Sequence, residues 1–112
     1  MTKNNIRIGM MSVAHQHAIS YLACLKALPD VELVGLWYED ATVAADVAGR
    51  FDLPIFDSPE ALVRANLDGV VICSENAKHR EHVELAAGEV PYILCEKPIS
   101  TNIDDGKAMI QI

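Results

Sequence analysis

A lysine between a glutamate and a proline follows a short apolar stretch near the end of the chain. The stretch is Val90–Leu94, and the segment after it reads Cys95-Glu96-Lys97-Pro98. An apolar run of this length, entered by Pro91 and followed by Pro98, is typical of a buried parallel strand. The carboxyl end of such a strand lies at the edge where open α/β sheets bind their ligands. We therefore expect the Lys97 ammonium to meet a substrate there, with Pro98 fixing the turn that aims it.

The rest of the chain alternates between apolar runs and stretches with apolar residues at helical spacing. Ser58, Pro59 and Glu60 combine a side-chain cap, a proline suited to a first turn and an acid that favours the helix dipole, so they predict a helix start. Gly88 is expected to end a helix. The predicted strands are residues 6–11, 31–38, 54–56, 69–73 and 92–95, and the other predicted helices are 18–28, 43–51, 81–87 and a last one through 108–110.

This order predicts an α/β fold, with a doubly wound parallel sheet in a Rossmann-like three-layer α/β/α arrangement. Strands that are apolar on both faces imply a sheet covered on both sides, with right-handed crossovers. The length of 112 residues indicates one domain over 1–112. The last apolar pattern stops at Ile112 without a cap, so we expect a second domain beyond this chain.

Composition argues against several classes of function. The formal net charge of −7 repels nucleic-acid phosphates, so we expect no nucleic-acid partner. A signal peptide is not evident, and no apolar stretch is long enough to span a bilayer, which favours a cytoplasmic protein without a membrane partner. Cys24, Cys73 and Cys95 are odd in number and lie in predicted apolar elements, so we expect buried free thiols.

Three segments together resemble the Gfo/Idh/MocA oxidoreductases. They are the opening Ile6-Arg7-Ile8-Gly9, the stretch Ser74–His79 after the fourth strand, and Glu96-Lys97-Pro98 after the fifth. The resemblance runs from about Ile6 to Ile112 and corresponds to the family's N-terminal Rossmann domain. It implies NAD(P)-dependent oxidation or reduction of a sugar, cyclitol or related polyol. It also implies a C-terminal α/β domain that supplies substrate contacts and a homo-oligomer interface, so the 112-residue chain alone is expected to be inactive.

The resemblance assigns the chemistry to Lys97. The matching lysine of the family lies beside the reacting carbon and the nicotinamide, where a positive charge stabilises a forming alkoxide or assists proton transfer. Glu96 is expected to orient Lys97 or to bind a cofactor ribose hydroxyl, and Pro98 belongs to the same cofactor-binding segment. The alternative is a solvated lysine at a strand end.

The segment Gly9–Ala14 is the predicted dinucleotide turn. A fingerprint of this kind needs a glycine for the turn, a second for close approach of the pyrophosphate and a small third residue. Gly9 takes the first place and Ala14 the third, whereas Met11 occupies the close-approach position and is expected to keep the pyrophosphate farther from the backbone. A plain strand-to-helix turn is the alternative. The cofactor-binding candidates here are Gly9, Met11, Ser12, Val13, Ala14 and His15.

A ribose-binding acid is expected at the carboxyl end of the second strand. The aligned residue is Tyr38, followed by Glu39 and Asp40. Either an acid binds the ribose or Tyr38 lines the adenosine site; alternatively, both acids simply open the next helix. Because no arginine stands nearby to hold a 2′-phosphate, NAD is favoured as the cofactor and NADP is not excluded.

The segment after the fourth strand supplies the remaining candidates. The resemblance implies that Asn76 fixes the nicotinamide half of the cofactor, with Ser74 lining the same crevice; a helix cap is the alternative for Asn76. His79 is expected to bond the backbone at this crevice.

Two histidine pairs have spacings that permit metal binding. His79 and His82 lie three residues apart, and His15 and His17 form an H-x-H sequence. No acid or cysteine cluster converges on either pair in the sequence, so we expect no metal site, and His17 is expected on a helix face.

Two other classes of protein remain as alternatives. A phosphoacceptor receiver domain shares the length, the acidity, a hydroxyl such as Ser74 and a Lys-Pro pair such as Lys97-Pro98. It requires acids after its first and third strands to bind Mg²⁺, whereas the first strand here leads into Met10, Met11 and Ser12. The other alternative is a non-catalytic module that only binds a dinucleotide.

Overall fold

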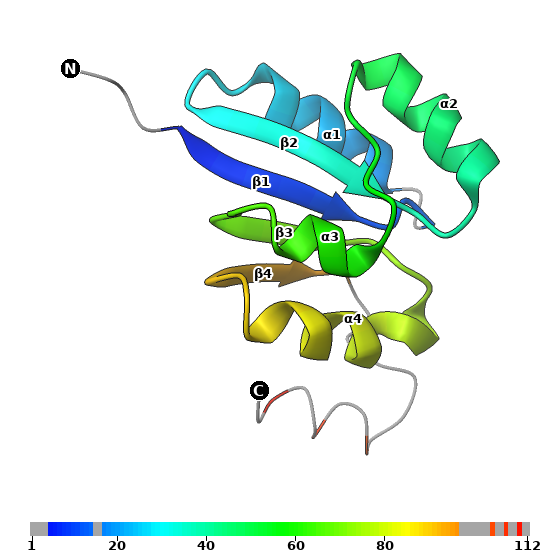
Figure 1. Ribbon diagram of the computed structural model, residues 1–112, viewed down its shortest axis with the longest axis vertical. Coiled ribbons are helices and arrows are strands. Elements are labelled where there is room, and N and C mark those ends of the chain that lie inside the picture. The colour runs from blue at the N-terminus through cyan, green and yellow to red at the C-terminus, as the bar shows by residue number, and fades with distance from the viewer. Residues whose placement is uncertain (1–4, 15–16, 97–103, 105–106, 108–109, 111–112) are drawn as a thin grey trace.

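The computed structural model describes residues 5–14, 17–96, 104, 107 and 110 of the 112-residue chain, with only the backbone described at residue 76. Four parallel strands form one sheet in the order β2-β1-β3-β4 (Figure 1). The fold class is therefore the predicted Rossmann-like α/β. The strands are β1 (Ile6–Met11), β2 (Val31–Trp37), β3 (Gly69–Ile72) and β4 (Tyr92–Cys95), and the helices are α1 (His17–Ala27), α2 (Ala41–Phe51), α3 (Pro59–Val63), the 3₁₀ turn η1 (Asn76–Lys78) and α4 (His79–Ala87).

The predicted strand at residues 54–56 is only a single bridge beside β2. The Leu36 N–H donates to the Pro54 carbonyl (3.1 Å), and the Phe56 N–H donates to the Leu36 carbonyl (2.8 Å). Pro54 has no N–H of its own to extend the ladder. A Cβ at Gly35 would lie 2.7 Å from Phe56 Cε2, so this glycine allows the segment to pack closely on β2. The brief third strand predicted at these residues is therefore reduced to one bridge.

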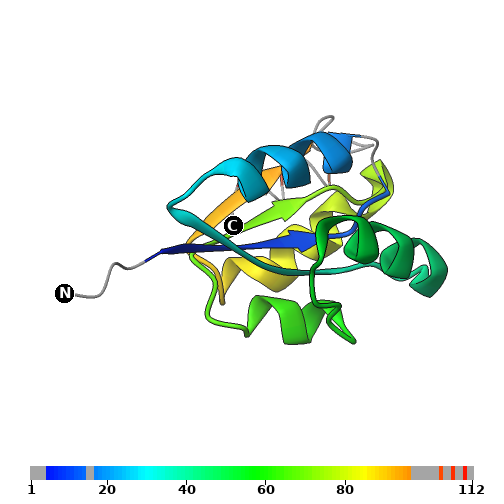
Figure 2. The ribbon, with the colours of Figure 1, turned by 90° about the horizontal axis from the view of Figure 1, so that it is seen from above.

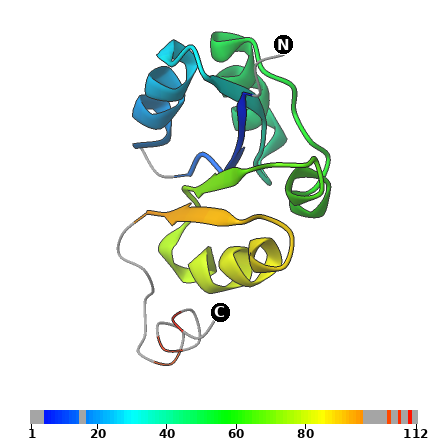
Figure 3. The ribbon, with the colours of Figure 1, turned by 90° about the vertical axis from the view of Figure 1, so that its left-hand side faces the viewer.

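The sheet separates two hydrophobic cores. Side chains alternate along a strand, so Met10 of β1 packs with α1 and α2, whereas Met11 packs with α3 and α4. Figures 2 and 3 show α1 on one side of the sheet and α3 and α4 on the other. The edge strand β4 is covered on one face only, because Tyr92 and Leu94 are exposed. The expected cover on both faces is therefore incomplete at β4.

Helix starts follow the predicted chemistry. Ser58 Oγ accepts the Ala61 N–H (3.0 Å), Pro59 lies in the first turn of α3, and Glu60 follows it, as predicted. Gly88 lies at the end of α4, also as predicted. These local signals need no tertiary contact, which explains why the sequence reveals them.

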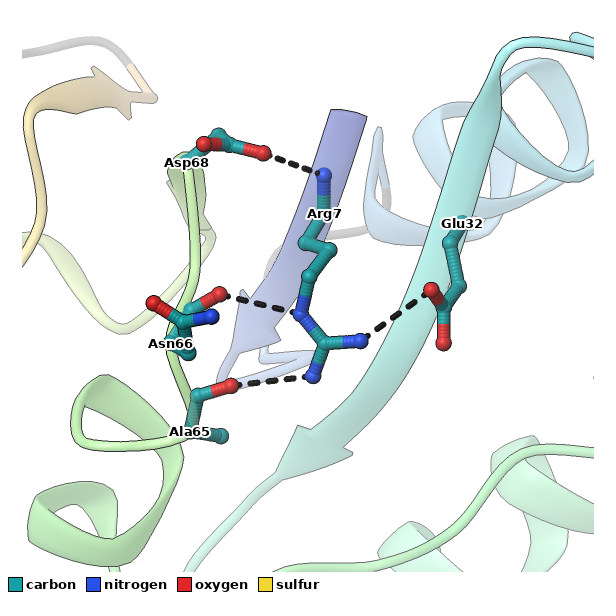
Figure 4. Close-up of polar contacts among 5 residues, drawn as sticks. All are labelled: Arg7, Glu32, Ala65, Asn66 and Asp68. Carbon is teal, nitrogen blue, oxygen red and sulfur yellow. Dashed lines mark hydrogen bonds and ion pairs between the residues drawn. The ribbon is translucent and has the colours of Figure 1, made fainter. Parts of the chain in front are cut away.

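The amino ends of three strands are joined by Arg7 (Figure 4). Its guanidinium donates to the carbonyls of Ala65 and Asn66 (both 3.0 Å) and to Glu32 Oε1 of β2 (3.1 Å). The Arg7 N–H donates to Asp68 Oδ2 (2.8 Å), and the Asp68 N–H returns a bond to the Arg7 carbonyl (2.7 Å). These contacts fix the turn before β3 against β1 and β2. We call this side of the sheet the amino edge.

The three cysteines differ in exposure. Cys73 is buried and Cys95 half-buried, but Cys24 is exposed, so the expectation of three buried thiols was wrong. The helix α1 buries Ala18 and Leu22 against the sheet, and Cys24 lies outside this stripe. Burial raises the pKa of the Cys73 thiol to about 12 and that of Cys95 to about 11. Within the part of the chain that the structure describes, no helix has the length and apolarity needed to cross a bilayer.

Candidate functional site

Polar segments gather at one edge of the sheet because all four strands run parallel. The register places Met11 beside Trp37 and Ile72, and Ile72 beside Cys95. The chain leaves the adjacent strands β1 and β3 toward opposite faces, which makes their shared end the switch point where open sheets bind ligands. We call this side the carboxyl edge; it is formed by residues 12–14, 38–40, 73–78 and 96.

The first turn begins three residues later than the sequence predicted. Gly9 lies inside β1 and is buried. A Cβ on Gly9 would lie 2.8 Å from Leu67 Cδ1 and 2.9 Å from Leu62 Cδ1. Gly9 therefore permits close packing against these two leucines, and its predicted place in the turn was wrong.

Met11 also lies outside the turn. Its side chain is fully buried in the core under α3 and α4, and the side chain of Met10 is fully buried on the opposite face. Neither methionine extends over the carboxyl edge. Met11 therefore does not occupy the close-approach position of the turn that the sequence assigned to it.

Ser12 makes the turn instead. Its φ of 71° lies in the left-handed region that favours glycine. The Ser12 N–H donates to the Trp37 carbonyl (2.6 Å), and Ser12 Oγ accepts the Ala14 N–H (3.2 Å). Val13 is half-buried and Ala14 is exposed, and α1 begins at His17.

The acids after β2 have different partners. Asp40 Oδ1 accepts the N–H groups of Thr42 and Val43 (both 3.1 Å) and so caps α2, as the alternative interpretation of these acids predicted. Glu39 instead forms an ion pair with Lys78, and this contact lowers the Glu39 pKa. Tyr38 is half-buried. Burial is the main cause of its raised pKa, and the negative charges of the nearby acids raise the pKa further.

A buried polar cluster supports the segment after β3. Ser74 Oγ and His82 Nδ1 lie 2.7 Å apart, and His79 Nε2 donates to the Ser74 carbonyl (3.1 Å). The Trp37 ring meets the His82 ring edge-on, with centroids 5.6 Å apart. Burial lowers the pKa of His82, which favours the neutral imidazole. His79 thus bonds the backbone here, and Asn76 begins η1 in the same segment.

Glu96 ties the end of β4 to α1. Its side chain is only 4% exposed, and its Oε2 accepts the Tyr21 hydroxyl (2.6 Å) and lies 3.4 Å from His17 Nδ1. The hydrogen bond to Glu96, and to a smaller extent burial, raise the pKa of Tyr21 to about 12. The residue immediately before Lys97 is therefore held against the first turns of α1. Lys97, Pro98 and His15 themselves lie outside the described residues.

A groove of about 730 Å³ opens beside the carboxyl edge on the face that carries α3 and α4. Among the described residues, no group of three or more histidine, cysteine or acidic side chains is placed to hold a metal ion. The residues that line the groove are Trp37, Glu39, Pro59, Glu60, Lys78, Glu81, His82, Glu84 and Leu85.

Sequence reasoning missed two residues that hold the site together, Lys78 and Tyr21. Lys78 pairs with a residue 39 positions away, and Tyr21 bonds one 75 positions away. A contact between residues so far apart leaves no pattern in the local sequence that could predict it. Their positions could have been suspected only from the parallel topology, which brings the segments after β2 and β3, and those after β1 and β4, to one edge.

The model of a family described as "Oxidoreductase family, NAD-binding Rossmann fold" (GFO_IDH_MocA) matches residues 6–112. Among curated proteins, the chain is 28% identical over 102 residues to glucose-6-phosphate 3-dehydrogenase of Bacillus subtilis, covering 91% of this chain and 28% of that protein. It is 30% identical over 109 residues to UDP-N-acetylglucosamine 3-dehydrogenase of Acidithiobacillus ferrooxidans, covering 95% of this chain and 33% of that one.

The crystal structure of the latter enzyme superimposes with a TM-score of 0.84 at 29% identity, covering 96% of this chain and 34% of that chain. The chain thus spans about a third of the length of the relatives that it matches.

Proposed function

The chain belongs to the GFO_IDH_MocA oxidoreductase family, and on this premise we propose that its carboxyl edge binds a nicotinamide dinucleotide for an enzyme that acts on a sugar, cyclitol or related polyol. The proposed reaction transfers a hydride between the nicotinamide and a carbinol or carbonyl carbon. The curated relatives are named as dehydrogenases of glucose 6-phosphate, of a UDP-sugar and of inositol, which supports this substrate class.

The observation that carries the proposal is the shape of the first turn. Ser12 adopts a glycine-like φ, the side chains of the two preceding methionines are buried in the cores, and Ala14 is exposed two residues after Ser12. A dinucleotide needs this close approach of its pyrophosphate to the backbone and to a helix N-terminus. The residues present therefore fit the cofactor that the family model names.

Each part of the carboxyl edge has a proposed task. The backbone at residues 12–14 faces the pyrophosphate, and Glu39 accepts hydrogen bonds from the adenosine ribose, while Tyr38 lines the adenosine side. Ser74 is held by His82 and, with Asn76, borders the nicotinamide half. Gly9 and Met11 take no direct part, because both are buried in the strand.

Lys97 is proposed to act on the substrate. The nicotinamide, when bound, supplies the carbon that accepts or gives the hydride. A lysine ammonium beside the reacting hydroxyl stabilises the developing alkoxide and exchanges its proton. Glu96, anchored by Tyr21 and His17, fixes the strand end from which Lys97 follows. Substrate contacts and assembly into a homo-oligomer are proposed to depend on a further domain, since the relatives are about three times as long.

Binding and catalysis can be tested separately. Titration of this chain with NADH, followed by nicotinamide fluorescence, should give saturable binding. Lys97→Met should leave that affinity within about twofold, because the lysine acts on the substrate, and should lower turnover in the whole enzyme by roughly 10²–10⁴-fold. Lys107→Met, an exposed lysine in the same terminal region, is the matched control and should change neither quantity.

Two outcomes would contradict parts of the proposal. Absence of saturable NADH binding would refute the cofactor site. Unchanged turnover in Lys97→Met would refute the assigned lysine, and NADH binding without hydride transfer to any sugar or cyclitol would favour the non-catalytic module.

A further inference from the structure

Glu39 and Lys78 form an ion pair across the mouth of the groove at the carboxyl edge. Glu39 follows β2, and Lys78 ends η1 after β3, so the pair joins two segments that are distant in sequence. Both side chains line the groove and are partly exposed, 44% for Glu39 and 37% for Lys78. A ligand at this mouth would therefore meet both charges at once.

The surroundings of this pair are acidic. Four glutamates line the groove, and Lys78 is the one lysine or arginine among the described residues that do so. His82, the remaining titratable group, is buried with a lowered pKa and so adds no positive charge near neutral pH. Arg80, in the first turn of α4, donates a hydrogen bond to Glu84 (3.2 Å). The hydrogen bond to Glu39 raises the pKa of Lys78, which keeps the ammonium charged.

We propose that the Glu39–Lys78 pair sets the choice between NAD and NADP, with Lys78 as a 2′-phosphate-binding residue that Glu39 holds neutralised. The inference rests on the proposed function, because it places the adenosine ribose at Glu39. The intact pair carries no net charge. It offers a carboxylate to the ribose 2′-hydroxyl of NAD and no uncompensated cation to the 2′-phosphate of NADP.

Removing the carboxylate reverses this balance. A ribose 2′-phosphate carries close to two negative charges, and in the wild-type protein it meets an ammonium whose charge Glu39 already compensates. When Glu39 is replaced by glutamine, the Lys78 ammonium loses its partner and becomes available for a charge-assisted hydrogen bond to the phosphate. One such bond corresponds to an affinity gain of roughly tenfold or more.

The experiment is a double-mutant cycle read by NADH and NADPH titrations. Wild type should bind NADH at least about tenfold more tightly than NADPH. Glu39→Gln should bind NADPH about tenfold more tightly than wild type does, and NADH severalfold more weakly. Glu39→Gln with Lys78→Met should lose the NADPH gain, because the cation that produces it is gone.

A matched control removes an acid from another exposed ion pair. Glu89 lies 3.6 Å from Arg64, away from the groove, so Glu89→Gln changes the net charge by the same amount. It should leave the NADH-to-NADPH affinity ratio unchanged within about twofold. Circular dichroism checks that each variant is folded, which the exposure of Glu39 and Lys78 favours.

Three results would overturn the inference, and they differ in whether the proposed cofactor site would be refuted as well. Equal NADPH affinity in Glu39→Gln and in the double variant would show that Lys78 is not the phosphate partner. An unchanged cofactor ratio in Glu39→Gln would show that the ribose lies elsewhere, while the NADH site itself stands. Failure of the wild-type chain to bind either cofactor would refute the proposed function together with this inference.

Discussion

Two polar side chains at the carboxyl edge are buried and are held by hydrogen bonds. Glu96 and His82 are both nearly inaccessible, yet each has a defined partner: the Tyr21 hydroxyl for Glu96 and the Ser74 hydroxyl for His82. A buried polar group without such a partner would destabilise the fold. These contacts fix the segments after β3 and β4, from which the proposed cofactor and substrate contacts are made.

The lowered pKa of His82 gives the stability of the fold a pH dependence. Burial lowers this pKa below the ordinary value of 6.5, so the unfolded chain binds a proton that the folded chain does not. The free energy of unfolding should therefore fall as pH decreases below about 6.5. The measurement is urea unfolding followed by circular dichroism at pH 7.5 and at pH 5.

His82→Asn is the matched variant, because an amide can still bond Ser74 and does not titrate. Its free energy of unfolding should decrease less between the two pH values than that of wild type. Equal decreases in the two proteins would show that His82 does not contribute to the acid sensitivity.

How much of the site the sequence could predict depended on distance along the chain. The candidates Ser12, Glu39 and Ser74 lie at the carboxyl edge. The sequence could predict this, because the ends of the strands that precede them could be recognised from the apolar pattern. The ion pair between Glu39 and Lys78 could not be predicted from the sequence, because it depends on which segments lie opposite each other across the switch point.

Strands and helices were placed well wherever a local signal marked them. The error at residues 54–56 arose because a short apolar run does not show whether it forms a ladder or a single bridge. The error at the first turn arose because Gly9 resembles a turn glycine in sequence. Its actual neighbours, Leu62 and Leu67, contact it only once α3 has packed on β1.

Gly9 offers a direct test of this packing. Gly9→Val should lower the free energy of unfolding by about 1–3 kcal/mol, because its side chain would overlap Leu62 and Leu67. At Gly49 in α2 an added Cβ would meet open space, so Gly49→Ala should instead raise the free energy of unfolding by about 0.5–1 kcal/mol. Urea unfolding measures both changes.

The alternative role for Gly9 predicts a different pattern. If this glycine acted in the cofactor turn, Gly9→Val would weaken NADH binding while leaving the free energy of unfolding unchanged. That combination would contradict the packing described here.

The whole sheet has two edges with different tasks. The amino edge is joined by Arg7, whose hydrogen bonds reach Glu32, Ala65 and Asn66. The carboxyl edge carries the groove, the turn at Ser12 and the acids after β2. This division follows from an all-parallel sheet, in which one edge collects strand starts and the other collects strand ends. Fold class was therefore predictable from the order of elements alone.

The central claim is that a nicotinamide dinucleotide lies across the carboxyl edge. The most direct test is a titration of the isotopically labelled chain with NADH, followed by backbone amide NMR shifts. The account predicts saturable shifts at residues 12–14, 38–40 and 74–78, with the amides of Arg7, Asn66 and Asp68 unchanged. Shifts confined to the amino edge, or amides at the carboxyl edge that do not respond to saturating NADH, would contradict it.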